Sequence, residues 1–274
     1  MNALLILTFI LFILMCLFGG KTGIVSFLTL FLNFIILFIT VLFIVFGASI
    51  YVMSLIFCLL IAAVNLFLLN RFNIKTIAAF VASIATTLLM LGAIYWSVHF
   101  GHLQGFTPEE QDETYIFSLN IGIDMTQFMI FTVILAVIAA VIDLAITISS
   151  PVYELYLTNP TLTQRQLFSS GMRVGREILA TSANTIYLAF LGGSLTLLFW
   201  FFNLDYSFGH LINAKLFTQE VVTIVLGGIA IALCIPMTAF ITAWLLKRAN
   251  RLTFIHEEAN ITSAQSANSK MRHH

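Results

Sequence analysis

The feature that most constrains this chain is a long run without charge, residues 22–70. A helix needs about 20 apolar residues to cross the hydrocarbon core of a bilayer, so the run is too long for one crossing and suits two. The segment Gly47-Ala48-Ser49 is the only small and flexible one near its middle, which predicts a tight helical hairpin there. The apolar runs are continuous rather than alternating, so we expect helices and not a membrane barrel.

Composition extends this conclusion to the whole chain. Hydrophobic residues make up 60% of it and charged residues only 9%, whereas a soluble domain has roughly 25% charged residues. This balance excludes a soluble enzyme, a disordered chain and a nucleic-acid binder. The three cysteines lie inside apolar runs, and their spacing fits neither a disulfide framework nor a metal site. The expected fold class is an all-α polytopic transmembrane bundle.

The apolar runs predict about seven spans. No basic segment precedes the first span, as it would in a cleaved signal peptide, so we expect that span to be retained. Residues 1–250 are expected to form a single membrane domain, and residues 251–274 a disordered tail rich in Ser, Asn, Ala and Gln. The expected spans are approximately Ala3–Leu17, Ile24–Phe46, Ala48–Leu69, Thr76–Val98, Asp124–Ser150, Glu177–Phe202 and Glu220–Leu246.

The basic residues predict the orientation of this bundle. With seven spans and a cytoplasmic C-terminus, eleven of the 12 Lys and Arg residues fall in cytoplasmic segments, and only Lys215 falls outside. The long loop at 99–124 contains five acids and no Lys or Arg, so it is expected on the outer side. The N-terminus is then outside, and the lipid bilayer of a bacterial plasma membrane is the expected environment.

Asp143 is the one formal charge well inside an expected span. A central Asp costs roughly 2.5–3.5 kcal/mol on insertion scales, so such a residue usually faces protein or water. Two readings stay open. The carboxyl group is either protonated and hydrogen-bonded to a hydroxyl such as that of Thr147, one turn away, or it takes part in proton or ion movement.

A second group of candidate residues lies in the sixth expected span. Asn184 is at a depth similar to that of Asp143 and lies in a stretch of small and polar residues, so we expect the two to face each other, either as a packing contact or in a transport site. Arg176 and Glu177 begin this span. Arg176 is either a topology anchor, or it pairs with Asp143 or gates a cavity. A Thr163/Gln166 capping pair predicts a separate interfacial helix over Thr163–Gly175. Asn33, Asn65 and Ser83 are expected to make helix-packing hydrogen bonds.

Several segments resemble the YibE/F-like family of bacterial integral membrane proteins, and together they cover most of the chain. They are Gly19-Gly20-Lys21-Thr22-Gly23, residues 141–150, Val152-Tyr153-Glu154-Leu155, Asn159-Pro160, Ser170-Gly171-Met172, Gly175-Arg176-Glu177-Ile178, Asn184-Thr185, residues 191–195 and residues 235–239. The resemblance implies a multi-pass membrane protein without implying a particular activity, and it suggests a homologous subunit as a partner. The order of elements in 141–195 is more weakly similar to the membrane half of SecD/SecF and RND-type proteins, which use intramembrane acids to couple proton flow.

The sequence contains no nucleotide-binding, nucleophile-elbow or metalloprotease motif, so we expect no enzyme activity, no cofactor, no metal and no nucleic-acid partner. Two functions remain. One is a transport or export permease, proton-coupled through Asp143, for an unknown small molecule or ion. The other is a non-catalytic membrane subunit that scaffolds a homologous partner.

Overall fold

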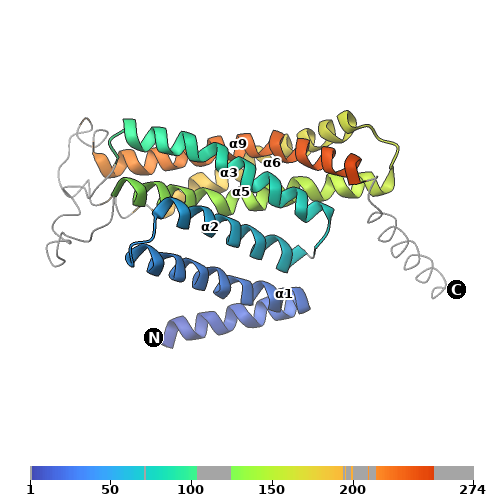
Figure 1. The fold of residues 1–274 in the computed structure, drawn as a ribbon. Helices are drawn as coiled ribbons and strands as arrows, with labels where there is room; N and C mark the ends of the chain where they lie inside the picture. The colour runs from blue at the N-terminus through green and yellow to red at the C-terminus, as the bar shows by residue number, and fades with distance from the viewer. Residues whose placement is uncertain are drawn as a thin grey trace.

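The computed structural model describes residues 2–70, 72–103, 125–193 and 214–249, with single positions at 195, 199 and 209. Within these ranges all regular structure is helical (Figure 1). Most of the expected outer loop, the end of the sixth expected span and the expected tail lie outside the described residues. In chain order the elements are α1 (Asn2–Val45), α2 (Ile50–Ala63), the π-helix η1 (Val64–Leu68), α3 (Ile74–Phe100), α5 (Met125–Thr158), α6 (Gln164–Gly193) and α9 (Lys215–Ala249).

Helix α1 is two helices joined by a sharp turn at Gly20. The backbone there has φ 52° and ψ −132°, a combination that glycine adopts without the steric penalty of a Cβ atom. The two segments fold back on each other (Figure 1). The rings of Phe12 and Phe27, one from each segment, lie 4.9 Å apart. A Cβ atom added to Gly23 would collide with the backbone oxygen of Met15. The turn lies in the predicted gap between the first two expected spans.

Five helices in the described ranges are long and apolar enough to cross a membrane: α1, α2 with η1, α3, α5 and α9. Their outer surfaces are unlike those of a soluble protein, because large apolar side chains such as Phe18 (89% exposed) and Phe34 (66%) face outward. The chain is therefore an all-α membrane protein. The Gly47 turn between α1 and α2, with φ 91°, falls in the segment predicted for the hairpin.

Helices α3, α5 and α9 all pack against one another, and α6 packs against α9. Small residues at the contacts are almost fully buried, among them Ala82 of α3, Ala145 of α5 and Ala230 of α9. Small side chains let membrane helices approach closely, since dispersion contacts rather than hydrophobicity hold them together. Not every polar group is satisfied in this core. The hydroxyl of Ser83, expected to make a packing hydrogen bond, is buried without a partner in the described part of the chain.

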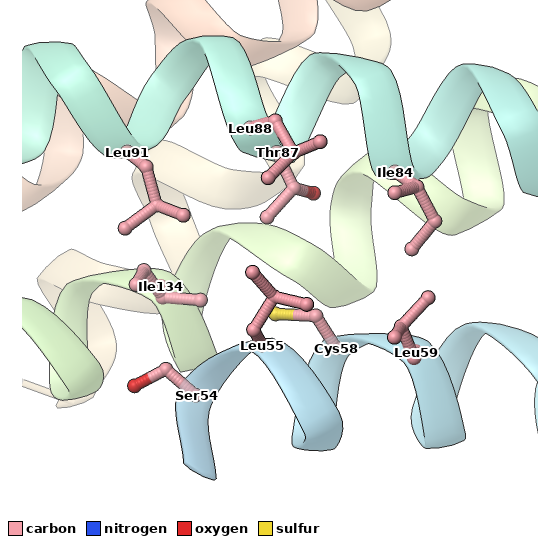
Figure 2. A pocket seen from close by; sticks show the side chains of 9 residues that line it. All are labelled: Ser54, Leu55, Cys58, Leu59, Ile84, Thr87, Leu88, Leu91 and Ile134. Atoms are coloured by element: carbon pink, nitrogen blue, oxygen red, sulfur yellow. The ribbon is translucent and has the colours of Figure 1, made fainter. Parts of the chain in front are cut away.

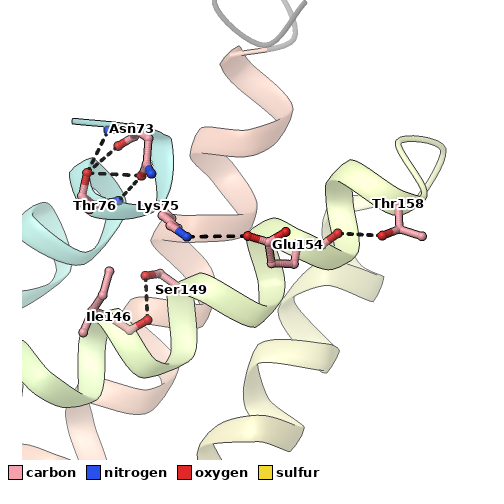
Figure 3. A network of polar contacts seen from close by, with 7 residues as sticks. All are labelled: Asn73, Lys75, Thr76, Ile146, Ser149, Glu154 and Thr158. Carbon is pink, nitrogen blue, oxygen red and sulfur yellow. Dashed lines mark hydrogen bonds and ion pairs between the residues drawn. The ribbon is translucent and has the colours of Figure 1, made fainter. Parts of the chain in front are cut away.

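Charged side chains mark one end of the bundle. Lys75, at the start of α3, forms an ion pair of 3.6 Å with Glu154 near the end of α5 (Figure 3). A capping box between Asn73 and Thr76 begins α3 beside this ion pair. The Nζ of Lys247, near the end of α9, donates to the backbone oxygen of Pro160 over 3.2 Å. These contacts hold the start of α3, the end of α5, the α5–α6 loop and the end of α9 together.

Two of the expected boundaries are wrong. Helix α5 continues past Ser150 through Pro151 to Thr158, and α6 is one helix from Gln164 to Gly193 rather than an interfacial helix followed by a span. The Thr163/Gln166 cap is confirmed: the backbone N–H of Thr163 donates to the Gln166 Oε1 over 2.8 Å, and that of Gln166 donates to the Thr163 Oγ1 over 3.3 Å. Gly171 and Gly175 pack the first half of this helix closely against Ala239 and Ile235 of α9, so this segment belongs to the bundle.

Candidate functional site

An open groove of about 720 Å³ lies between the second segment of α1, the α2–η1 helix and α5. Most of its walls are apolar, and Phe34, Phe57 and Ile138 are among them. Six polar residues interrupt these walls. They are Thr22, Ser26, Asn33, Asn65, Asn70 and Asp143. We call this cavity the Asp143 groove. Thr22 and Asn70 lie at one end of this groove. Lys75 and Glu154 lie at the same end of the bundle, because α3 begins shortly after Asn70.

Two asparagines close the groove on the side of α1 and η1. Asn33 Nδ2 donates to the Oδ1 of Asn65 over 3.0 Å, and Asn65 Nδ2 donates back to the Oδ1 of Asn33 over 3.1 Å. Asn65 also donates to the backbone oxygen of Ile61, at 2.8 Å. The expectation of packing hydrogen bonds at both residues is confirmed. Asn65 lies within the π-helical turn, a distortion frequent at functional sites.

Asp143 lies on the α5 wall of the groove and its side chain is exposed. Val141, Ala145 and Ile148 of the same helix are buried against the bundle, so the opposite face of α5 presents Asp143 and Thr147 outward. The Thr147 hydroxyl donates over 2.7 Å to the backbone oxygen of Asp143, not to its carboxylate. Within the described ranges the carboxylate has neither an ion-pair nor a hydrogen-bond partner.

The other sequence candidates lie on α6. Arg176 and Glu177 are exposed and line a shallow hollow of about 330 Å³ together with Ser169, Met172 and Arg173. Asn184 is exposed further along the helix. Neither Arg176 nor Asn184 bonds to Asp143 in the described structure, and neither lines the Asp143 groove. The structure thus brings Asp143 together with Asn33 and Asn65 around one cavity.

A second cavity, between α2, α3 and α5, is too small to be a ligand site. Its volume is about 10 Å³, close to the minimum for one water molecule. Figure 2 shows its lining, which is apolar apart from Ser54, Thr87 and Cys58. Both hydroxyls are already used, since Ser54 donates to the Ile50 oxygen and Thr87 to the Ser83 oxygen.

The position of Asp143 along α5 bears on what the groove can do. Asp143 lies about 16 Å along the helix from Glu154, at about 1.5 Å per residue. A carboxylate within an apolar helix and next to an open cavity can take up a proton or a cation. Sequence reasoning missed the groove, although Thr22, Ser26 and Asn33 follow one face of their helix and were a usable signal.

Comparison with known proteins identifies a family. No curated protein and no solved structure matches the chain. Residues 7–248 match the family model described as YibE/F-like protein, which covers most of the sequence. The chain therefore belongs to the YibE/F-like protein family.

Proposed function

We propose that the chain is a transport or export permease coupled to proton movement, with Asp143 as the coupling residue. The observation that supports this most is the Asp143 groove, in which a single carboxylate borders a cavity of about 720 Å³. A charge at mid-depth costs free energy in a membrane, so its exposure to a cavity favours a functional role over a packing one. Broken helices beside such sites are common in transporters, and the π-helical turn that contains Asn65 is such an interruption in the wall of this groove.

The proposed topology has seven crossings in a bacterial plasma membrane, with the N-terminus outside and the C-terminus in the cytoplasm. The turn at Gly20 supports two crossings within α1, and α6, more polar than the other helices, is the sixth. The groove end at Thr22 and Asn70 then faces the cytoplasm. A reporter fused after Lys75 should read out as cytoplasmic, whereas an external readout would contradict the topology.

The permease proposal is tested in liposomes that contain a trapped pH-sensitive dye and the purified full chain. Amino acids, sugars, inorganic ions and organic cations are supplied in turn as outward gradients. We expect at least one class to drive proton movement, and Asp143→Asn to abolish it at unchanged membrane abundance. Equal proton movement by Asp143→Asn, or none above empty liposomes for every class, would contradict the proposal.

A second candidate is a membrane subunit that scaffolds a homologous partner. The observation that favours it is the exposed polar face of α6, formed by Arg173, Arg176, Glu177, Thr181 and Asn184. Polar side chains facing lipid are unfavourable, and interhelical hydrogen bonds to a partner would relieve this. Under this hypothesis Asn184→Leu weakens co-purification with a homologous chain, and Asp143→Asn is tolerated. Retained co-purification with Asn184→Leu would argue against this face as the contact.

A further inference from the structure

The walls of the Asp143 groove restrict the ligands it can accept. Among the described residues that line it, Asp143 has the only charge, and there is no Lys, Arg or His. The protein therefore supplies no counter-ion for this carboxylate from its own described groove residues. In a medium of low dielectric constant an unpaired carboxylate is costly, and a bound cation offsets that cost.

The neighbouring polar groups do not replace such a cation. Each of the Asn33 and Asn65 amides donates to the carboxamide oxygen of the other, and the remaining bond of Asn65 goes to Ile61. Each of these oxygens thus accepts one hydrogen bond, and neither amide donates to the Asp143 carboxylate in the described structure. Mg²⁺ and Ca²⁺ take six or more oxygen ligands, and the described residues hold no group of three or more His, Cys, Asp or Glu side chains, so such an ion at Asp143 would keep most of its water.

The rest of the groove suits an apolar body. Phe34, Leu37 and Phe57 lie on the α1 and α2 side, and Leu135, Ile138 and Ile142 lie on the α5 side. Its volume of about 720 Å³ is within the roughly 300–1,000 Å³ typical of sites for drug-sized ligands. An aromatic ring attracts a cation placed over its face, and Phe34 lines the groove with its side chain 66% exposed.

From these observations we propose that the Asp143 groove binds a lipophilic organic cation with one positive charge, and that Asp143 is its counter-ion. The proposal rests on the proposed permease function in that it names the substrate class of the same cavity. One carboxylate matches one positive charge, and the apolar walls match a ligand that partitions into the bilayer and reaches the open side of the groove. A neutral or anionic molecule of the same shape would leave the carboxylate unpaired.

The test is equilibrium binding of radiolabelled tetraphenylphosphonium to the purified full chain in nanodiscs of neutral lipid. We expect saturable binding to the wild type, and Asp143→Asn to bind at least about tenfold more weakly, a loss of ~1.4 kcal/mol. Glu220→Gln, which removes an acid near the start of α9 and outside the groove, is the matched control and should bind as the wild type does. Tetraphenylborate, which has the same shape and the opposite charge, should not bind saturably.

Two more variants keep the result interpretable if Asp143→Asn folds poorly. Asp143→Glu retains the charge and should bind within a few-fold of the wild type. Ala139→Trp fills the groove one turn away and should abolish binding while the carboxylate remains. No saturable binding above empty nanodiscs, unchanged binding by Asp143→Asn or by Ala139→Trp, or equal binding of tetraphenylborate would each overturn the proposal.

The binding measurement uses no gradient, so its outcome is separate from that of the transport assay. Proton movement driven by a neutral compound, with no binding of tetraphenylphosphonium, would overturn the substrate class and leave the permease standing. Binding of the cation with no compound-driven proton movement would overturn the permease and leave a cation-binding membrane protein.

Discussion

At the scale of single residues, the pairing of Asn33 with Asn65 depends on two local features of the backbone between them. The sequence indicates that each amide needs a hydrogen-bond partner inside the membrane. It does not indicate which partner, because the register of the pair depends on the Gly47 turn and on the π-helical turn that contains Asn65. No sequence pattern predicts that π-helix, so the partner becomes known only from the fold.

The reciprocal pair predicts a strong coupling between the two positions. Asn33→Leu and Asn65→Leu should each destabilise the protein by about 1–2 kcal/mol, because each leaves the other amide unpaired beside the groove. The double variant should lose less than the sum of the two, since no orphaned amide remains. Unfolding titrations with a denaturing detergent measure all three values, and strict additivity would contradict the pair.

Asp143 shows which part of a site the sequence can predict. Its position was evident, because it is the only charge deep in an expected span. Its neighbours were not, since Asn33 of α1 and Asn184 of α6 are both amides at comparable depth. The rotation of α5 about its axis determines which amide lies near Asp143. Val141, Ala145 and Ile148 pack against the bundle, so Asp143, on another face of the helix, lines the groove.

At the scale of elements, the fold-back of α1 depends on glycine at the point of closest approach. Gly23→Ala should destabilise the hairpin by about 1–3 kcal/mol, because the new Cβ atom meets the backbone oxygen of Met15, which cannot rotate away. Gly19→Ala is the matched control, since its added Cβ has no atom within 4 Å. Thermal unfolding in detergent should show a loss for Gly23→Ala alone, and equal midpoints for the two variants would contradict the observed turn.

The contact of α6 with α9 depends on a second pair of glycines. Gly171 and Gly175 have the small-xxx-small spacing typical of close helix pairs in membranes, a signal in the sequence that the expected break at residue 176 obscured. A Cβ atom on Gly171 would lie 2.8 Å from that of Ala239, and one on Gly175 would collide with Ile235. The contact places the segment that was expected to form an interfacial helix within the bundle.

Replacing Gly175 should therefore separate the two helices. We expect Gly175→Leu to lower the free energy of unfolding by about 1–3 kcal/mol or more through overpacking against Ile235. Gly192→Leu, on the same helix, has no atom within 4 Å of its added Cβ and should be close to neutral. Tryptophan fluorescence during thermal unfolding measures the stability of both variants. A loss of the same size at both positions would mean that α6 does not pack as described.

At the scale of the whole molecule, the packing of the helices defines the fold class, whereas the distribution of charge predicts the orientation in the membrane. The apolar exterior and the small residues at the contacts of α3, α5 and α9 make this an all-α membrane bundle. Hydropathy alone was sufficient to predict that class and most of the helices. The proposed orientation rests on the basic residues and not on the packing, because the same bundle packs equally well either way up. The groove required the fold, since it is formed by three helices from distant parts of the sequence.

The central claim is that Asp143 borders an accessible cavity inside the membrane, and labelling of a single cysteine tests it most directly. In a background in which Cys16, Cys58 and Cys234 are replaced by Ala, Asp143→Cys is treated with a water-soluble, positively charged methanethiosulfonate in inverted membrane vesicles. The groove predicts that this cysteine is modified, and that Ser149→Cys, fully buried on the opposite face of α5, is not. An Asp143→Cys protein that is abundant in the membrane but as unreactive as Ser149→Cys would contradict the account.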